Sequence, residues 1–187
     1  KSILYVCTEA QPFCATGGLA DVCGSLPKRL KNEYPECDIR VILPLYKNTK
    51  IDRTKLTNVG NTYVSLSWRK EYCGVFSYEM DNVTYYFVDN EKYFKRDGFY
   101  GYNDDGERFA FFSKSILDIL PLINFYPDII HVNDWQSALV PVYLKTYLWN
   151  DKRYNNIKTI LTIHNITYQG RFGREILTDI LGFDAKH

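Results

Sequence analysis

Three clusters of polar residues follow apolar runs that are typical of buried strands, and each could contribute to a ligand site. The clusters occupy residues 8–9 together with a glycine pair at 17–18, residues 131–135, and residues 164–170. Ligands of parallel α/β sheets bind at the carboxyl ends of the strands, which lie along one edge. The sequence therefore predicts one active cleft built from these three clusters.

The glycine pair Gly17 and Gly18 lies between an apolar run at residues 3–7 and a helical pattern. Backbone N–H groups of such a turn can approach an anion closely, and the positive end of the helix dipole adds to the attraction. The turn therefore predicts a phosphate or diphosphate site. Its spacing matches neither G-x-G-x-x-G nor G-x-x-x-x-G-K-S/T, and a plain chain reversal is the alternative interpretation.

The polar residues after the other two strands also have simpler interpretations. Asp134 could cap the helix that follows it, and a histidine at a strand end is often a hydrogen-bonded structural residue. His131 and His164 could bind a metal, but no carboxylate or cysteine lies at ligand spacing near either of them. We therefore expect no metal site, and no Ser-His-Asp set can be argued from spacing.

Strand and helix patterns alternate along the chain, which favours a Rossmann-like, three-layer α/β/α fold with a mostly parallel sheet. The expected strands cover residues 3–7, 38–44, 127–132 and 159–163, with a small β-meander insertion at residues 62–68, 72–78 and 83–88. The expected helices cover residues 18–31, 103–120, 137–148 and 174–181. In the first helix we expect a kink or break at Pro27 and an inner face made of Leu19, Val22, Leu26 and Leu30.

Length and composition favour a single domain over residues 1–187, since 45% hydrophobic residues can build one sizeable core. A net charge of +1 gives no reason to expect a nucleic acid partner, and no apolar run is long enough to cross a membrane. No signal or transit peptide is visible at the start. The odd number of cysteines, five, favours reduced core residues over disulfides. The 16 tyrosines suit sugar binding and ordinary packing equally well.

Residues 12–27 read P-F-C-A-T-G-G-L-A-D-V-C-G-S-L-P. This stretch closely resembles the N-terminal signature of bacterial glycogen synthases and plant starch synthases, P-F-x-K-T/S-G-G-L-A/G-D-V-x-G-x-L-P. Residues 99–109, 131–136 and 162–170 resemble three further motifs of the same family, in the family's order and at about its spacing. One position departs from the signature, because Ala15 stands where the family usually has a lysine.

The resemblance implies a GT-B glycosyltransferase, in which two Rossmann-like domains face each other across a cleft. Such enzymes transfer glucose from ADP-glucose to the non-reducing end of an α-1,4-glucan, with retention of configuration and without a metal or other cofactor. This chain resembles the N-terminal, acceptor-side domain, and the donor-binding C-terminal domain is absent. We therefore expect this fragment to be inactive alone. The family implies a cytoplasmic location in bacteria, or a plastid in plants, and the choice between ADP- and UDP-glucose stays open.

By position in the motifs, the resemblance implies two catalytic residues, His164 beside the transferring glucose and Asp21 facing the sugars. Gly17 and Gly18 would meet the donor diphosphate. The other implied substrate-binding residues are Glu9, Thr16, Asp134, Trp135, Asn165, Tyr168 and Gln169. Losing the family's lysine at Ala15 would cost roughly 1.5–3 kcal/mol of donor binding.

Two other functions remain as alternatives. A non-catalytic glucan-binding module could keep the same fold after losing the lysine, and Ala15 favours that alternative while His164 and Asp21 oppose it. A dinucleotide-binding oxidoreductase is disfavoured, because no G-x-G-x-x-G follows the first strand.

Overall fold

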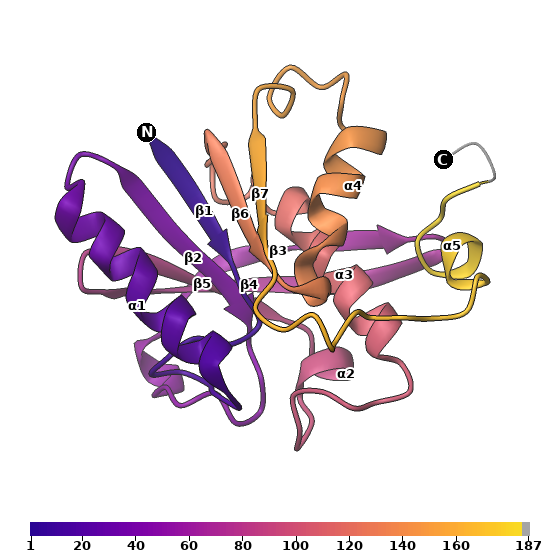
Figure 1. Cartoon of the computed structure of the whole chain (residues 1–187), viewed down its shortest axis with the longest axis horizontal. Helices are drawn as coiled ribbons and strands as arrows, with labels where there is room; N and C mark the ends of the chain where they lie inside the picture. Colours follow the sequence, from indigo (N-terminus) through magenta and orange to yellow (C-terminus); the bar gives the residue numbers. More distant parts are fainter. Residues whose placement is uncertain (185–187) are drawn as a thin grey trace.

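One seven-stranded sheet organises the protein, and its strands follow the order β3-β4-β5-β2-β1-β6-β7 (Figure 1). The computed structural model describes residues 1–184. Neighbouring strands from β5 to β7 are parallel, whereas β3, β4 and β5 pair antiparallel. The strands are β1 Ser2–Val6, β2 Asp38–Pro44, β3 Thr57–Leu66, β4 Arg69–Met80, β5 Val83–Asp89, β6 Ile129–Asn133 and β7 Lys158–Thr162.

The expected meander is present, and it forms one end of the main sheet. Its last strand, β5, pairs in parallel with β2, so the antiparallel strands extend the parallel ones directly. The expected strand at residues 62–68 begins earlier, at Thr57, and ends at Leu66. Ser67 has a φ of 56°, which turns the chain back into β4.

Helices cover both sides of the sheet, as expected for a doubly wound fold. Helix α1, Gly18–Glu33, lies on one side, while α3, Asp105–Asp118, and α4, Leu139–Thr146, pack together on the other (Figure 1). The chain runs from β1 outward to β2 and later returns to β6 on the far side of β1, and right-handed crossovers then place the helices on opposite faces. The short elements are α2 Glu91–Phe94, α5 Ile176–Asp179 and two 3₁₀ turns, Arg53–Lys55 and Trp135–Ser137.

The expected inner face of α1 is wrong in part, and of the kink or break expected at Pro27 the break does not occur. Val22 is 38% exposed, and the helix continues through the buried Pro27 to Glu33. The buried face consists of Ala20, Cys23, Gly24 and Pro27. These small residues follow helical spacing and let α1 approach the chain beneath it, which a pattern of large apolar residues does not capture.

The expected helix at residues 137–148 is shorter and starts differently. A 3₁₀ turn at Trp135–Ser137 comes first, and α4 follows with Pro141 in its first turn, where the missing N–H costs no intrahelical bond. The expected last helix is observed as the single turn α5. Both differences are at element ends, where local patterns are weakest.

Side chains of the central strands fill the core. Leu4, Val41, Ile42 and Val132 have no exposed surface, and the expected burial of Cys7 and Cys23 is confirmed. All five cysteines are buried and unpaired. Within residues 1–184, no helix has both the length and the apolar composition needed to cross a membrane.

Candidate functional site

A cavity of about 840 Å³ lies where the three predicted clusters meet. Residues from after β1, after β6 and after β7 line it, together with the loop before α3. The three clusters therefore meet at the carboxyl ends of the strands, as predicted. The lining residues are Glu9, Thr16, Gly17, Gly18, Leu19, Tyr100, Gly101, Asp105, Asp134, Trp135, Gln136, His164, Asn165 and Tyr168.

One side of the cavity, the glycine wall, consists of Glu9 and residues 16–18. The buried Glu9 carboxylate accepts a hydrogen bond from Thr16 Oγ1 at 2.7 Å and a second from the Thr16 backbone N–H. These bonds fix the turn that leads into Gly17 and Gly18 at the start of α1. Nothing lies within 4 Å of where a Cβ would be on either glycine, so their backbone faces open space.

The opposite side, the histidine wall, consists of residues 134–135 and 164–168. Asn133, which is fully buried, donates from Nδ2 to the Val6 carbonyl at 2.9 Å. Because that carbonyl can only accept, Asn133 Oδ1 faces His164 Nε2, 2.9 Å away. The His164 Nε2 therefore carries the proton, and in a neutral ring Nδ1 keeps the free lone pair.

Asp134 is not a helix cap, so that alternative is wrong. Its carboxylate makes no cap hydrogen bond and instead accepts from the His164 backbone N–H, at 2.7 Å. Asp134 has a φ of 57°, an uncommon conformation for a residue other than glycine. Strain of this kind concentrates at functional sites, and here it accompanies the bond that holds His164 at the end of β7.

Trp135 of the histidine wall is packed between three neighbouring residues. Gly170, with a φ of 59°, lies so close to the indole that a Cβ there would be 2.3 Å from Trp135 Cε3. The rings of Phe109 and Phe172 contact the same indole, with centroids 5.3 and 5.6 Å away. The chain after β7 therefore lies directly on Trp135, and any residue larger than glycine at position 170 would displace it.

Two predicted site residues lie away from this cavity. Asp21 is exposed in the first turn of α1 and is not in the lining. Gln169 lines an adjoining cavity of about 490 Å³, where its side chain bonds the Ile166 carbonyl and the Arg171 guanidinium. The roles of both residues stay predictions.

Five residues of the cavity lining were not predicted as site residues, and Tyr100 and Asp105 are two of them. The Tyr100 hydroxyl lies 2.7 Å from Thr8 Oγ1, and burial raises the Tyr100 pKa well above its usual range. Asp105 accepts from the Gly101 backbone N–H at 2.8 Å and pairs with the buried Arg108 at 2.6 Å. The sequence held a signal for them, because both residues lie in the 99–109 motif, to whose individual residues no role was assigned.

His131 is a hydrogen-bonded residue packed within the protein, and it is not in the lining of the cavity. Its Nε2 lies 2.8 Å from Thr162 Oγ1, and its ring packs edge-on against Tyr5 with centroids 4.7 Å apart. Burial, with a smaller effect from His164, lowers the pKa of His131. In the part of the chain that the structure describes, no three His, Cys, Asp or Glu side chains are grouped as metal ligands.

Comparison with known proteins places the chain in one family. The family model of the starch synthase catalytic domain matches residues 2–187. The glycogen synthase of Caldicellulosiruptor bescii is 49% identical over 186 residues, covering 99% of this chain and 38% of that protein. The glycogen synthase of Ligilactobacillus salivarius is 47% identical, over 99% of this chain and 39% of that protein.

A solved structure agrees with these relatives. The catalytic domain of starch synthase IV from Arabidopsis thaliana, bound to ADP and acarbose, superposes with a TM-score of 0.85 at 28% identity. The match covers 98% of this chain and 38% of the other chain, so this chain spans about two fifths of the length of the relatives it matches. The expected α/β fold, that of one half of a GT-B enzyme, is confirmed. The four motifs occur in the family's order and form one cleft, and the family model matches nearly every residue. The chain therefore belongs to the starch synthase catalytic domain family.

Proposed function

We propose that this chain is the acceptor-side part of a retaining glucosyltransferase that moves glucose from ADP-glucose to the non-reducing end of an α-1,4-glucan. The observation that carries the proposal is the cavity between the two walls. An open helix start that suits an anion lies opposite a histidine whose proton position is fixed. The names of the relatives, glycogen synthases, support the reaction class.

The donor diphosphate would lie against Gly17 and Gly18. Their N–H groups are at the N-terminus of the 16-residue helix α1, whose dipole favours an anion, and nothing lies within 4 Å of where a Cβ would be on either glycine. Thr16 adds a hydroxyl whose position Glu9 fixes. The Arabidopsis starch synthase structure contains ADP, which supports an adenosine diphosphate donor over a uridine one.

The glucan would lie against the aromatic and acidic residues of the cavity. Trp135, Tyr100 and Tyr168 offer flat apolar faces for sugar rings, and Asp105 and Asp134 offer acceptors for hydroxyl groups. The same Arabidopsis structure contains acarbose, an observation in keeping with an oligosaccharide in this cleft. Asn165 and Gln169 would contribute amide groups nearby.

His164 would act on the transferring glucose. With Nε2 bonded to Asn133, its Nδ1 and its backbone carbonyl can face the sugar and support positive charge developing at the anomeric carbon. Asp21 would face the sugars from the start of α1 when the second domain closes on this one. Both roles make their contribution chiefly in the transition state.

A second domain is the partner that this proposal requires. A GT-B site needs both faces of its cleft, so residues 1–187 alone should transfer no glucose, whereas the complete enzyme should. We propose that the complete enzyme uses no cofactor or metal and that it is cytoplasmic. Incubating radiolabelled ADP-glucose and glycogen with each protein, beside a heat-killed control, tests both statements.

Because Ala15 stands where the family usually has a lysine, we also consider one alternative, a glucan-binding module without catalysis. Glycogen binding by the complete protein, without incorporation of label from either ADP-glucose or UDP-glucose, would favour that alternative. Incorporation from ADP-glucose would support the transferase and exclude the module.

A further inference from the structure

Residues 163–175, called the wall segment below, carry much of the histidine wall, and several of their apolar side chains are exposed. Ile163, Ile166 and Tyr168 are 55%, 66% and 68% exposed, so apolar burial does little to hold the segment in place. At its first end, the segment is fixed by β7 and by the bonds of His164 to residues 133 and 134. Its other end leads into α5.

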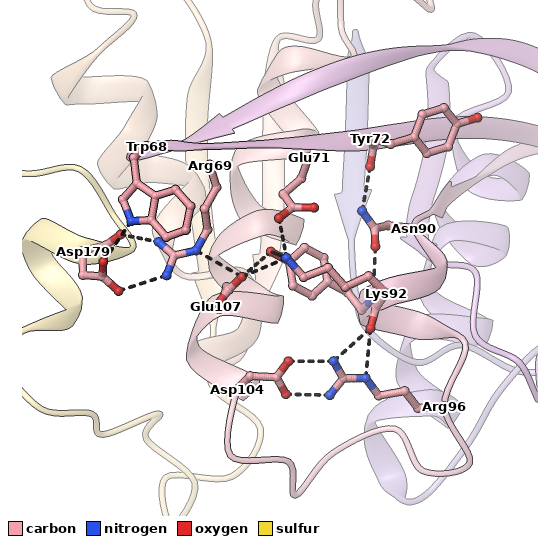
Figure 2. Close-up of polar contacts among 11 residues, drawn as sticks. Trp68, Arg69, Glu71, Tyr72, Asn90, Lys92, Arg96, Asp104, Glu107 and Asp179 are labelled. Atoms are coloured by element: carbon pink, nitrogen blue, oxygen red, sulfur yellow. Dashed lines mark hydrogen bonds and ion pairs between the residues drawn. The ribbon is translucent and has the colours of Figure 1, made fainter.

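Helix α5 cannot hold that second end by apolar packing alone. It is a single turn without a buried residue. Ile176 and Ile180 pack against the core, and polar contacts from the β3–β4 turn add to this packing. Trp68 Nε1 donates to Asp179 Oδ1 at 3.0 Å, Arg69 Nη2 lies 3.0 Å from Asp179 Oδ2, and Arg69 Nη1 donates to the Asp179 carbonyl (Figure 2). Ser67 Oγ donates to the Thr178 carbonyl at 2.9 Å.

Arg69 connects α5 to the interior as well. Its side chain is 12% exposed, its guanidinium lies 4.3 Å from the centre of the Trp68 ring, and its Nε lies 3.3 Å from Glu107 Oε1 (Figure 2). Glu107 in turn accepts from the Tyr93 hydroxyl at 2.6 Å and pairs with Lys92. Arg69 therefore joins α5 to α3, the helix that carries Asp105 into the cavity.

A close contact on α3 completes this anchoring. A Cβ on Gly106 would lie 2.8 Å from Ile176 Cδ1 and 3.2 Å from Phe172 Cδ1. The end of the wall segment therefore rests directly on the backbone of α3, next to Glu107. Any shift of α5 would move Phe172, and with it the segment that lies on Trp135.

We propose that Arg69 and Asp179 are positioning residues for the proposed glucosyl transfer. Their ion pair, the Arg69–Asp179 clamp, keeps the far end of the wall segment on α3, so that the histidine wall keeps its shape. Neither residue lines the cavity, so both act through the segment rather than on the sugar. The effect on catalysis rests on the proposed function, whereas the anchoring does not.

Limited trypsin digestion of the complete enzyme tests the anchoring, because Arg171 and Arg174 lie within the wall segment. In Asp179→Asn, cleavage after these arginines, identified by mass, should be about threefold faster, since proteolysis follows the population of the open form. The matched control is Asp38→Asn, which breaks another Asp–Arg pair of similar exposure, 50% against 54%, far from the segment. Unchanged cleavage in Asp179→Asn, or equal acceleration in Asp38→Asn, overturns the proposal.

A second pair of variants separates positioning from general destabilisation. Arg69→Lys keeps the charge but not the fork that reaches Asp179 and Glu107 together. Combined with Asp179→Asn, it should accelerate cleavage by less than the two single effects together, because both variants lose the same ion pair. Additive acceleration would overturn the clamp.

The effect on catalysis is read in the same variants of the complete enzyme. In Asp179→Asn the kcat should fall about threefold while the KM for ADP-glucose and the urea midpoint of unfolding stay unchanged. Faster cleavage with unchanged kcat overturns the positioning role and leaves the transferase standing. A wild-type enzyme without transfer would refute the proposed function, while the digestion would still decide whether the clamp exists.

Discussion

The two walls of the cavity are built in different ways. The glycine wall is held from within, because the buried carboxylate of Glu9 fixes Thr16 and α1 packs against the sheet through small residues. The histidine wall depends on the polar bonds of His164 to residues 133 and 134, and its side chains Ile166 and Tyr168 are exposed. One wall is thus complete in this chain, whereas the other presents apolar surface of the kind that marks a contact site.

This difference agrees with the proposed division of labour. A site for a diphosphate gains from a rigid turn, because N–H groups bind an anion best when they are already oriented. In the proposed enzyme, the wall segment would instead face a glucan and a second domain, and it would have to accommodate partners on several sides. The exposed side chains Ile160, Leu161 and Ile163 also lie at β7, the last strand of the sheet, where no further strand covers its edge among residues 1–184.

The largest effect should come from the histidine wall. In the complete enzyme, His164→Ala should lower kcat about 100-fold, because a group that supports developing charge contributes mainly in the transition state. The KM for glucan should change little. Steady-state kinetics with glycogen and ADP-glucose measure both constants. If only KM changed, the role assigned to His164 would be wrong.

On the glycine wall, Glu9→Gln should have the next largest effect. The amide keeps the shape but loses the charge that accepts two bonds from Thr16, contacts worth roughly 1.5–3 kcal/mol each when charged. We expect the dissociation constant for ADP to rise about tenfold, since a loosened turn no longer presents oriented N–H groups. Isothermal titration of the complete enzyme measures it. Glu91→Gln, at an exposed residue on α2, is the matched control and should leave ADP binding unchanged.

The glycine wall was the more predictable of the two from the sequence. A fixed strand-glycine-helix pattern reports local backbone geometry, so Gly17, Gly18 and the start of α1 could be assigned from the order of residues alone. The histidine wall could be placed at the strand ends, but not the partners of His164. That Asn133 fixes its ring and that Asp134 binds its backbone depends on contacts between β6 and β7, which local patterns do not encode.

The face of α1 was mispredicted for a related reason. Val22 carries the stronger hydrophobic signal, yet Ala20, Cys23 and Gly24 are buried because close approach of the helix requires small side chains. Tyr100 and Asp105 were missed because the 99–109 motif supported the family resemblance without assigning a role to its individual residues. Both residues lie within the segment that resembles the family, in a loop whose approach to the cleft depends on the packing of α3 against the sheet.

Ala15→Lys should strengthen donor binding at the glycine wall and leave the histidine wall unchanged. The exposed position 15 precedes Thr16, and an added ammonium near the donor diphosphate should tighten donor binding about threefold at low salt. The gain should shrink as salt rises, because a partly exposed charge contact is screened. Dissociation constants for ADP-glucose, measured for both proteins at low and high salt, test this. An unchanged or weaker affinity at both salts would mean that a cation from the second domain already occupies the space.

The smallest expected effect concerns His131, which lies behind the histidine wall. Burial lowers its folded-state pKa below the ordinary value of 6.5, so the unfolded chain takes up the proton first as the pH falls. The stability that neutral His131 contributes is therefore present above pH 6.5 and is lost as the pH falls below it. His131→Phe keeps the ring beside Tyr5 but cannot titrate, so its free energy of unfolding should fall less steeply between about pH 7.5 and 5. Urea unfolding of both proteins across that range measures the two slopes, and parallel curves would show that burial of His131 is not coupled to proton uptake. A smaller slope in the variant would show that His131, unlike the exposed side chains of the histidine wall, is shielded from water in the folded protein.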